Sequence, residues 1–356
     1  IFVWRVSYSV LPRDRSIKVR KMRWRTVLTT LIAFLLLAPV LTAGPPGHPL
    51  APAATYFDSG WIPQPQNACQ VISHNLGGSV DDYAVEVLFL DTAVGGKGIH
   101  RRGYGGLDNA GSQEGAHWQR LTDSSIEVCR GANDPFVDSV RVRVSVPVPA
   151  GAVYDSGWTA INLNQTLTFP HNLGIPNTDL AVGLWFRDVG VGNIGIHHLG
   201  YGGLDITPFQ RRGAHWHHLT DNSVQVTRHA TDNAIDEVRV VVVPATPPDY
   251  DSLIALGGWQ AVASGSAFTF NHGLSWGPDM LLARGECRSP ALGIHQFYAG
   301  GNRHAITGWQ GSAMQQLKPN SVQVARLLDD GTCPEIRVRI WRRSASAFLP
   351  AVQRNQ

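Results

Sequence analysis

Two stretches of the chain carry the same run of histidine, tyrosine, aspartate and tryptophan, spaced alike and set among glycines. The histidine closes Gly-Ile-His, the tyrosine and aspartate belong to Gly-Tyr-Gly-Gly-Leu-Asp, and the tryptophan follows after a loop. An aromatic ring can cover the apolar face of a sugar, while imidazole and carboxylate groups bond its hydroxyls. Glycines let a ligand approach the backbone closely. We therefore single out as a candidate carbohydrate site His100, Tyr104, Asp108 and Trp118 in the first stretch, and His197, Tyr201, Asp205 and Trp216 in the second.

The same residues also have a purely structural interpretation. The glycines would then form tight, bulged turns, and the aromatic rings would belong to a core, where most aromatic side chains lie. A third, looser copy has Ala299 where a glycine follows the tyrosine in the others, and Met314 where they have tryptophan. We expect this copy to bind more weakly or to be structural. Exposure or burial of Tyr104 and Tyr201 distinguishes the two interpretations.

These stretches belong to a unit that the chain repeats three times. Asp-Ser-Gly-Trp opens the first two copies at 58–61 and 155–158, and His-Asn-Leu-Gly follows at 74–77 and 171–174. Each unit is long enough to bury its own core and too long for a solenoid repeat. The modules are expected to be either strung along the chain or docked together. The predicted division is an N-terminal segment with a Pro-rich linker at 1–54, modules at 55–147, 152–244 and 250–342, and an irregular tail at 343–356.

Alternating side chains predict that the modules are built from strands. Val140, Val142 and Val144 alternate with Arg141 and Arg143, a pattern that gives one buried face and one solvent-exposed face. No amphipathic helix is expected outside the N-terminal segment. Short strands separated by turn residues indicate an all-β chain of three tandem antiparallel β-sandwiches, or small barrels.

The N-terminal segment is predicted to be a signal peptide. Basic residues at 21–25 precede an apolar run at 27–38, and Leu41-Thr42-Ala43 offers a cleavage site after Pro39. An uncleaved membrane anchor is the alternative, although residues 26–43 are barely enough to span a bilayer. Export would make the protein secreted, extracellular or bound at the cell surface.

The four cysteines agree with export. Cys69 and Cys129 lie in the first module, and Cys287 and Cys333 lie in the third. The second module has threonine at both positions of the first pair, so the two positions change together, as expected of neighbours. Of the three connectivities that four cysteines allow, we favour one disulfide within each of these two modules.

Other kinds of chemistry find little support. The net charge is only +3 and charged residues make up 16%, so nothing indicates a nucleic-acid partner. A Gly-x-Gly-x-x-Gly sequence at 190–195 lacks the following helix that a dinucleotide site requires. The chain has no Cys-x-x-Cys pair and no His-Glu-x-x-His sequence. We expect no catalytic residue, no metal and no cofactor.

The remaining histidines are expected to be structural. His74, His171 and His272 each precede a turn, where an imidazole would bond the backbone. His215 and His217 in the second module would share one strand face, as metal ligands could. The other two modules do not repeat both, which argues against a repeated metal site.

The Asp-Ser-Gly-Trp opening, the His-Asn-Leu-Gly turn and the closing Val-Arg-Val-x-Val strand resemble two known kinds of module across residues 56–342. One is the H-type lectin domain, and the other is the β-rich module of phage tail fibres and bacterial surface proteins. The first resemblance implies a six-stranded antiparallel sandwich that binds sugars, often GalNAc, and commonly assembles as a trimer. The chain departs from that pattern by inserting the Gly-Ile-His and Gly-Tyr-Gly-Gly segment, so no binding residue is carried over.

We therefore expect a secreted or cell-surface, multivalent carbohydrate-binding or adhesion protein without catalytic activity. Three weak sites on one chain would raise the apparent affinity through avidity. Its partners would be glycans or a cell-surface polysaccharide, with self-association possible and membrane contact only through an uncleaved signal segment. A structural surface-layer or filament component is the alternative, and a glycan hydrolase, which needs two carboxylates across a cleft, is a third interpretation.

Overall fold

The computed structural model describes residues 56–109, 112–146, 153–190, 192–207, 210–304 and 308–342. These residues lie within one compact unit of the chain, residues 52–356. The predicted signal segment and linker at 1–54 and the predicted tail at 343–356 lie outside the described residues. Within the described part, the only α-helix is the four-residue α1 (Ser252–Ala255), and no helix is long and apolar enough to cross a membrane.

The first module is an antiparallel sandwich, and the all-β prediction is confirmed. One sheet has the order β1 (Tyr56–Pro63), β9 (Ser139–Ser145), β3 (Ala84–Asp91) and β4 (Gly98–His100). The other has the order β2 (Ala68–Ser73), β8 (Ser125–Arg130) and β7 (Ala116–Gln119), and a hairpin is formed by β5 (Leu107–Asn109) and β6 (Ser112–Glu114). Val87, Phe89, Trp118, Ile126 and Val140 fill the core and are fully buried.

The second and third modules repeat this arrangement, with the first strand split in two. In the second module the elements are β10 (Tyr154–Asp155), β11 (Thr159–Ala160), β12 (Thr166–Pro170), β13 (Leu180–Asp188), β14 (Gly195–His197), β15 (Leu204–Thr207), β16 (Gln210–Arg212), β17 (Ala214–His217), β18 (Ser223–Arg228) and β19 (Glu237–Pro244). In the third they are β20 (Tyr250–Asp251), β21 (Gln260–Ala261), β22 (Ala267–Asn271), β23 (Leu281–Ser289), β24 (Gly293–His295), β25 (Asn302–His304), β26 (Gly308–Gln310), β27 (Ser312–Gln315), β28 (Ser321–Arg326) and β29 (Glu335–Arg342). A short 3-10 turn precedes β3, β13 and β23, formed by η1 (Val80–Asp82), η2 (Asn177–Asp179) and η3 (Pro278–Met280).

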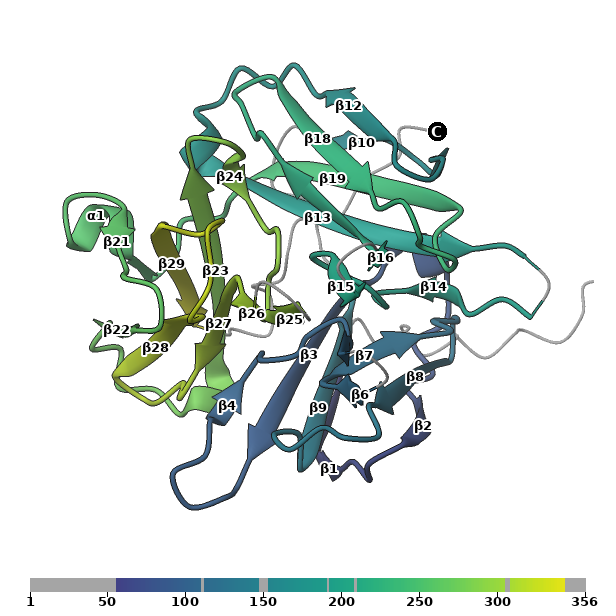
Figure 1. Ribbon diagram of the computed structural model, residues 1–356, viewed down its shortest axis with the longest axis horizontal. Coiled ribbons are helices and arrows are strands. Elements are labelled where there is room, and N and C mark those ends of the chain that lie inside the picture. Colours follow the sequence, from purple (N-terminus) through teal and green to yellow (C-terminus); the bar gives the residue numbers. More distant parts are fainter. Residues whose placement is uncertain are drawn as a thin grey trace, which may run out of the picture. The chain divides into compact units, whose positions relative to one another are not determined.

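The three modules are docked edge to edge and close a ring (Figure 1). The backbone amide of Leu121 in the first module donates to Ile196 of the second at 3.3 Å. Leu219 of the second donates to Ile294 of the third at 3.4 Å, and Leu317 of the third donates to Ile99 of the first at 3.1 Å. Because each edge pairs with the next module, the ring protects β7, β17 and β27 from pairing with other chains.

The isoleucine of each Gly-Ile-His sequence enters the core of a neighbouring module. Ile196 packs into the core of the first module, Ile294 into that of the second, and Ile99 into that of the third. Each core is therefore completed by a residue from another repeat. This explains why all three copies keep this isoleucine although the surrounding residues differ.

The arginine-bearing face of the closing strands is also buried, contrary to the expected solvent-exposed face. Arg143, Arg239 and Arg337 are at most 3% exposed. Arg239 Nε donates to Asp155 Oδ1 at 2.9 Å, and Arg337 Nε donates to Asp251 Oδ1 at 2.9 Å. The alternation correctly predicted the strands. It could not reveal that acids would neutralise these arginines, or that the preceding module of the ring would cover them, as where Arg239 and Arg337 donate to the carbonyl oxygens of Asp81 and Thr178.

Candidate functional site

The predicted site histidines are buried and bonded to backbone on both ring nitrogens. His100 and His197 have no exposed surface. Their Nε2 atoms lie 2.8 and 2.7 Å from the carbonyl oxygens of Phe136 and Ala234, and Nδ1 of each accepts from the amide two residues later. Burial lowers their pKa to about 4 and about 3, respectively. Each imidazole is thus neutral, and it connects its own strand, β4 or β14, to the loop that precedes β9 or β19.

The first tyrosine and tryptophan form a buried hydrogen-bonded chain into the second module. Trp118 Nε1 donates to Tyr104 Oη at 3.0 Å, and Tyr104 Oη lies 2.7 Å from Nδ1 of His198. Nε2 of His198 lies 2.8 Å from the carbonyl oxygen of Leu184. Since a carbonyl can only accept, Nε2 carries the proton and Nδ1 accepts from the tyrosine hydroxyl. Every polar side-chain group in this series of hydrogen bonds therefore has a partner.

The second copy makes the same connection to the third module. Tyr201 Oη donates to Oε1 of Gln296, and Trp216 Nε1 donates to the same oxygen at 3.2 Å. Trp216 is buried, and Tyr201 is partly accessible from the internal cavity described below. These residues connect modules rather than line an open surface.

The third copy follows a different register from the one that its sequence suggests. Parallel bridges pair Tyr104 with Ala116 and Tyr201 with Ala214, and the equivalent bridge pairs Ala299 with Ser312. Ala299 therefore replaces the tyrosine, not the glycine after it. Tyr298 instead takes the preceding glycine position, with a left-handed φ of 52°. The predicted alignment was wrong because Tyr-Ala-Gly-Gly mimics Tyr-Gly-Gly one residue out of step.

Asp108 and Asp205 lie in the hairpin strands β5 and β15, and their side chains are outside the described part of the structure. Of the eight predicted site residues, the structure thus places the two tyrosines and two tryptophans in hydrogen-bonded networks between modules, and buries the two histidines within their own modules. Their carbohydrate-binding role stays a prediction. Their geometry is that of interface and core residues.

A cavity of about 120 Å³, here called the axial cavity, lies where the three modules meet. Glu86 and Arg101 reach it from the first module, Tyr201 from the second, and Arg284 and Gln296 from the third. In the third module Ala299 and Met314 leave space that tyrosine and tryptophan fill elsewhere. Sequence reasoning missed this site because its residues come from three separate repeats.

A second space, here called the interface groove, lies between the first two modules and has a volume of about 290 Å³. Leu199 of the second module contributes apolar surface beside Gly106 of the first. The side chain of Arg212 has a buried Nε with no hydrogen-bond partner in the described structure. The other polar side chains that line it are Asn67, Glu114, His117, Gln119, Arg130, Asp232 and Asn233.

The corresponding positions at the other two interfaces are filled. Phe297 takes the place of Leu199 at the second interface, with its ring centroid 4.2 Å from that of His215. Arg102 takes it at the third, with its guanidinium 4.8 Å from the ring centroids of both Phe136 and Trp309. The first interface therefore has a leucine beside its groove, where the other two have larger side chains packed against aromatic rings.

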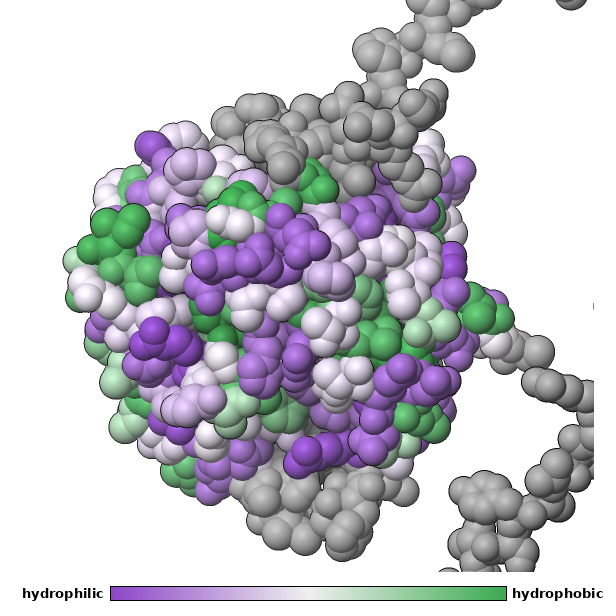
Figure 2. Space-filling view, turned by 90° about the horizontal axis from the view of Figure 1, so that it is seen from above, coloured by the Kyte–Doolittle hydropathy of each residue, from purple (hydrophilic) through white to green (hydrophobic). Residues whose placement is uncertain are grey.

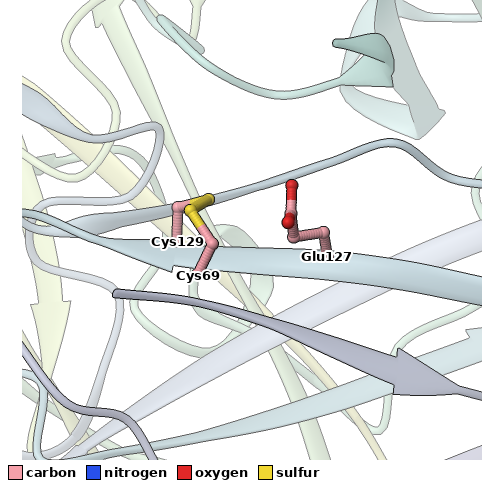
Figure 3. Close-up of side chains that lie close together, drawn as sticks. All are labelled: Cys69, Glu127 and Cys129. Atoms are coloured by element: carbon pink, nitrogen blue, oxygen red, sulfur yellow. A yellow bond between two sulfur atoms is a disulfide. The ribbon is translucent and has the colours of Figure 1, made fainter. Parts of the chain in front are cut away.

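Both predicted disulfides are present, Cys69–Cys129 and Cys287–Cys333. Cys69 and Cys129 face each other across β2 and β8, where the second module has a 2.7 Å hydrogen bond between Thr166 and Thr227. Glu127 lies near the first pair, but a disulfide offers no thiolate to a metal (Figure 3). Two disulfides indicate an oxidising environment.

The turn histidines also behave as expected. Nδ1 of His74, His171 and His272 accepts from the amide two residues later, at 3.3, 3.4 and 3.3 Å. His215 and His217 do share a strand face, with ring centroids 5.1 Å apart. Among the described residues, no histidine group brings three ligand atoms together closely enough for a metal.

Comparison of the chain with family models, with curated proteins and with solved structures finds no match. The resemblance to lectin or fibre modules therefore stays an expectation drawn from short motifs. A function has to be inferred from the ring, the axial cavity and the interface groove.

Proposed function

We propose that this is an extracellular carbohydrate-binding or adhesion protein, without catalytic activity, whose sugar site is the interface groove. The groove carries the proposal, because it combines one apolar wall with many hydrogen-bonding groups in a space near the lower end of ligand pockets. Sugar sites need this mixture of apolar surface and fixed donors and acceptors. The expected partners are glycans or a cell-surface polysaccharide.

Two groups in the groove are suited to bind neutral hydroxyls. Burial lowers the pKa of His117 to about 4, so its imidazole is neutral near neutral pH; Nε2 donates to Oε1 of Gln119 at 3.4 Å, which leaves Nδ1 to accept from a hydroxyl. Arg212 adds a donor that the described protein leaves unused at Nε. A sugar hydroxyl bound between these two groups would give the buried Nε of Arg212 the hydrogen-bond acceptor that it otherwise lacks.

Two further observations support the proposal. The disulfides fit export to an oxidising compartment. The closed ring of three sandwiches corresponds to the trimer that the resemblance to H-type lectins implies, here within one chain. Phe297 and Arg102 occupy the positions equivalent to Leu199, so we expect one sugar site in each chain. Multivalent adhesion would then require several chains at one surface.

A glycan array with the intact protein tests the proposal, using Leu199→Phe as the blocking variant. Phenylalanine stands naturally at the equivalent position of the third module, so the substitution should close the groove without a new kind of contact. Leu163→Phe, at a half-exposed position that does not line the groove, is the matched control. We expect the parent and the control to bind the same glycans, and the blocking variant to lose at least about tenfold in affinity, or about 1.4 kcal/mol.

Binding of no glycan by the parent, or equal binding by Leu199→Phe, would overturn the proposal.

Light scattering on the same sample tests the structural alternative, for which ordered assemblies would form without sugar. On the face shown in Figure 2, apolar residues form small patches separated by polar ones. Such a surface gives little support to assembly through a broad apolar contact.

A further inference from the structure

One position that the three modules share lines the axial cavity, and it differs in each: it is glutamate in the first module, glycine in the second and arginine in the third. The equivalence follows from the strand register, in which the histidines of β4, β14 and β24 pair with Phe89 of β3, Phe186 of β13 and Cys287 of β23. Three residues before these lie Glu86, Gly183 and Arg284, all of which line the cavity. The sequence repeat is therefore broken at the place where the modules meet.

The acid is already engaged. Glu86 Oε2 accepts from Arg143 Nη1 at 3.0 Å, and Oε1 lies 3.7 Å from Arg101 Nη2. Arg143 in turn also donates to Asp58 at 3.0 Å. Glu86 is thus already shared between two guanidinium groups, and its carboxylate offsets the charge of Arg284 only in part.

Arg284 is the cation without a partner. No described residue forms a hydrogen bond or ion pair with it, while it lies deep between the modules. Burial lowers its pKa to about 10, and the positive charges of Arg101 and Arg339 add to this effect, while Tyr201 and Glu86 oppose it. A partly buried cation whose nearest acid is already shared with other arginines is costly, and an anion beside it would lower that cost.

The space beside Arg284 can hold more than a water molecule. By the same measure, one water needs only about 10–15 Å³, and the cavity has about 120 Å³. Donors surround this space. Nε of Arg101 is buried without a partner, and Gln296 uses only its oxygen in the bonds from Tyr201 and Trp216, which leaves its amide nitrogen to donate.

We propose that the axial cavity binds one small oxyanion of the size of sulfate or phosphate, held by Arg284, Arg101 and the amide of Gln296. The tetrahedral oxygens of such an ion match donors that converge from two modules. The anion would act as the counter-charge that closes the first and third modules around the axis. This site is independent of the interface groove and of any sugar.

Thermal unfolding of the full chain at constant ionic strength tests the site. Because a ligand that binds only the folded state stabilises it, the melting temperature should rise and saturate as sulfate or phosphate replaces chloride. In Arg284→Gln, the apparent dissociation constant for sulfate should increase at least tenfold. Arg288→Gln, which removes a half-exposed arginine from the same strand, should respond like the parent.

Ala299→Tyr provides a second variant if Arg284→Gln folds poorly. It restores the tyrosine that the first two modules have at this position and fills the cavity, so it should also abolish the saturable response. A crystal soaked in selenate should show an anomalous peak beside Arg284. An equal response of all variants, a rise that does not saturate, or a response to chloride alone would overturn the proposal.

Discussion

At the residue scale, Tyr104 shows how a repeated motif can record an interface instead of an open site. Its hydroxyl accepts from Trp118 and donates to His198, a residue 94 positions later in the chain. Burial raises the pKa of Tyr104 and lowers that of His198, so both stay neutral. The identity of these residues is constrained by partners that the local sequence does not contain.

Replacing Tyr104 with phenylalanine should lower the free energy of unfolding by about 2 kcal/mol, because two buried partners lose their hydrogen bonds. Tyr250→Phe is the control, since the hydroxyl of Tyr250 is buried without a partner in the described structure. Its loss should be neutral or stabilising. Urea denaturation followed by circular dichroism measures both. Equal effects of the two substitutions would contradict the assigned hydrogen bonds.

Residue patterns predicted the contacts within one module better than the contacts between modules. The turn histidines and both disulfides could be predicted, because each depends on neighbours within one repeat. The burial of His100 and Trp118 could not be distinguished from ligand binding, since a core and a site both preserve residues between copies. The charges of Glu86 and Arg284 gave no signal at all, because they meet only in the assembled ring.

At the scale of elements, the Asp-Ser-Gly-Trp segments connect one module to the next. The aspartate binds an arginine of its own closing strand, as in the 2.7 Å bond from Arg141 to Asp58. The tryptophan reaches the 3-10 turn of a neighbour: Trp158 Nε1 donates to Asp81 in η1 at 2.9 Å, and Trp61 Nε1 donates to Asp279 in η3 at 3.1 Å. Strand periodicity predicted the elements but not which turn would receive each ring.

Trp158→Phe should therefore destabilise the ring by about 1 kcal/mol through the lost hydrogen bond to Asp81. Its ring would still pack near Arg187, whose guanidinium lies 4.6 Å from the ring centroid. Trp259→Phe is a matched control, because Trp259 stacks near Arg288 at 4.9 Å and its indole nitrogen has no partner among the described residues. Differential scanning calorimetry of both variants should show a larger decrease for Trp158→Phe; a reversed order would refute the connection.

At the scale of the whole molecule, neutral histidines are built into the contacts between modules. His198 lies at the first interface, and His215 and His229 stack at the second, 5.1 Å apart between ring centroids. Burial lowers the pKa of all three, and neighbouring imidazoles lower that of His215 further. These histidines are therefore harder to protonate in the folded ring than in the unfolded chain.

The stability of the ring should accordingly fall on mild acidification. The unfolded histidines titrate near 6.5, whereas the pKa is about 4 for folded His229 and about 3 for folded His197, so the unfolded state binds more protons between these values. Stability is then complete above about pH 6.5 and is lost as the pH decreases towards 4, at up to about 1.4 kcal/mol per pH unit for each histidine. Carboxylates such as Asp330, with lowered pKa, contribute only at lower pH.

Urea unfolding at several pH values between about 7 and about 5 measures this slope. His229→Leu should reduce it, because the equivalent residue of the third module is Leu327 and a leucine cannot take up a proton. Both the parent and the variant should unfold in one transition, since each core contains an isoleucine from another module. A free energy of unfolding that stays constant over this range would show that the interfaces do not exclude protons.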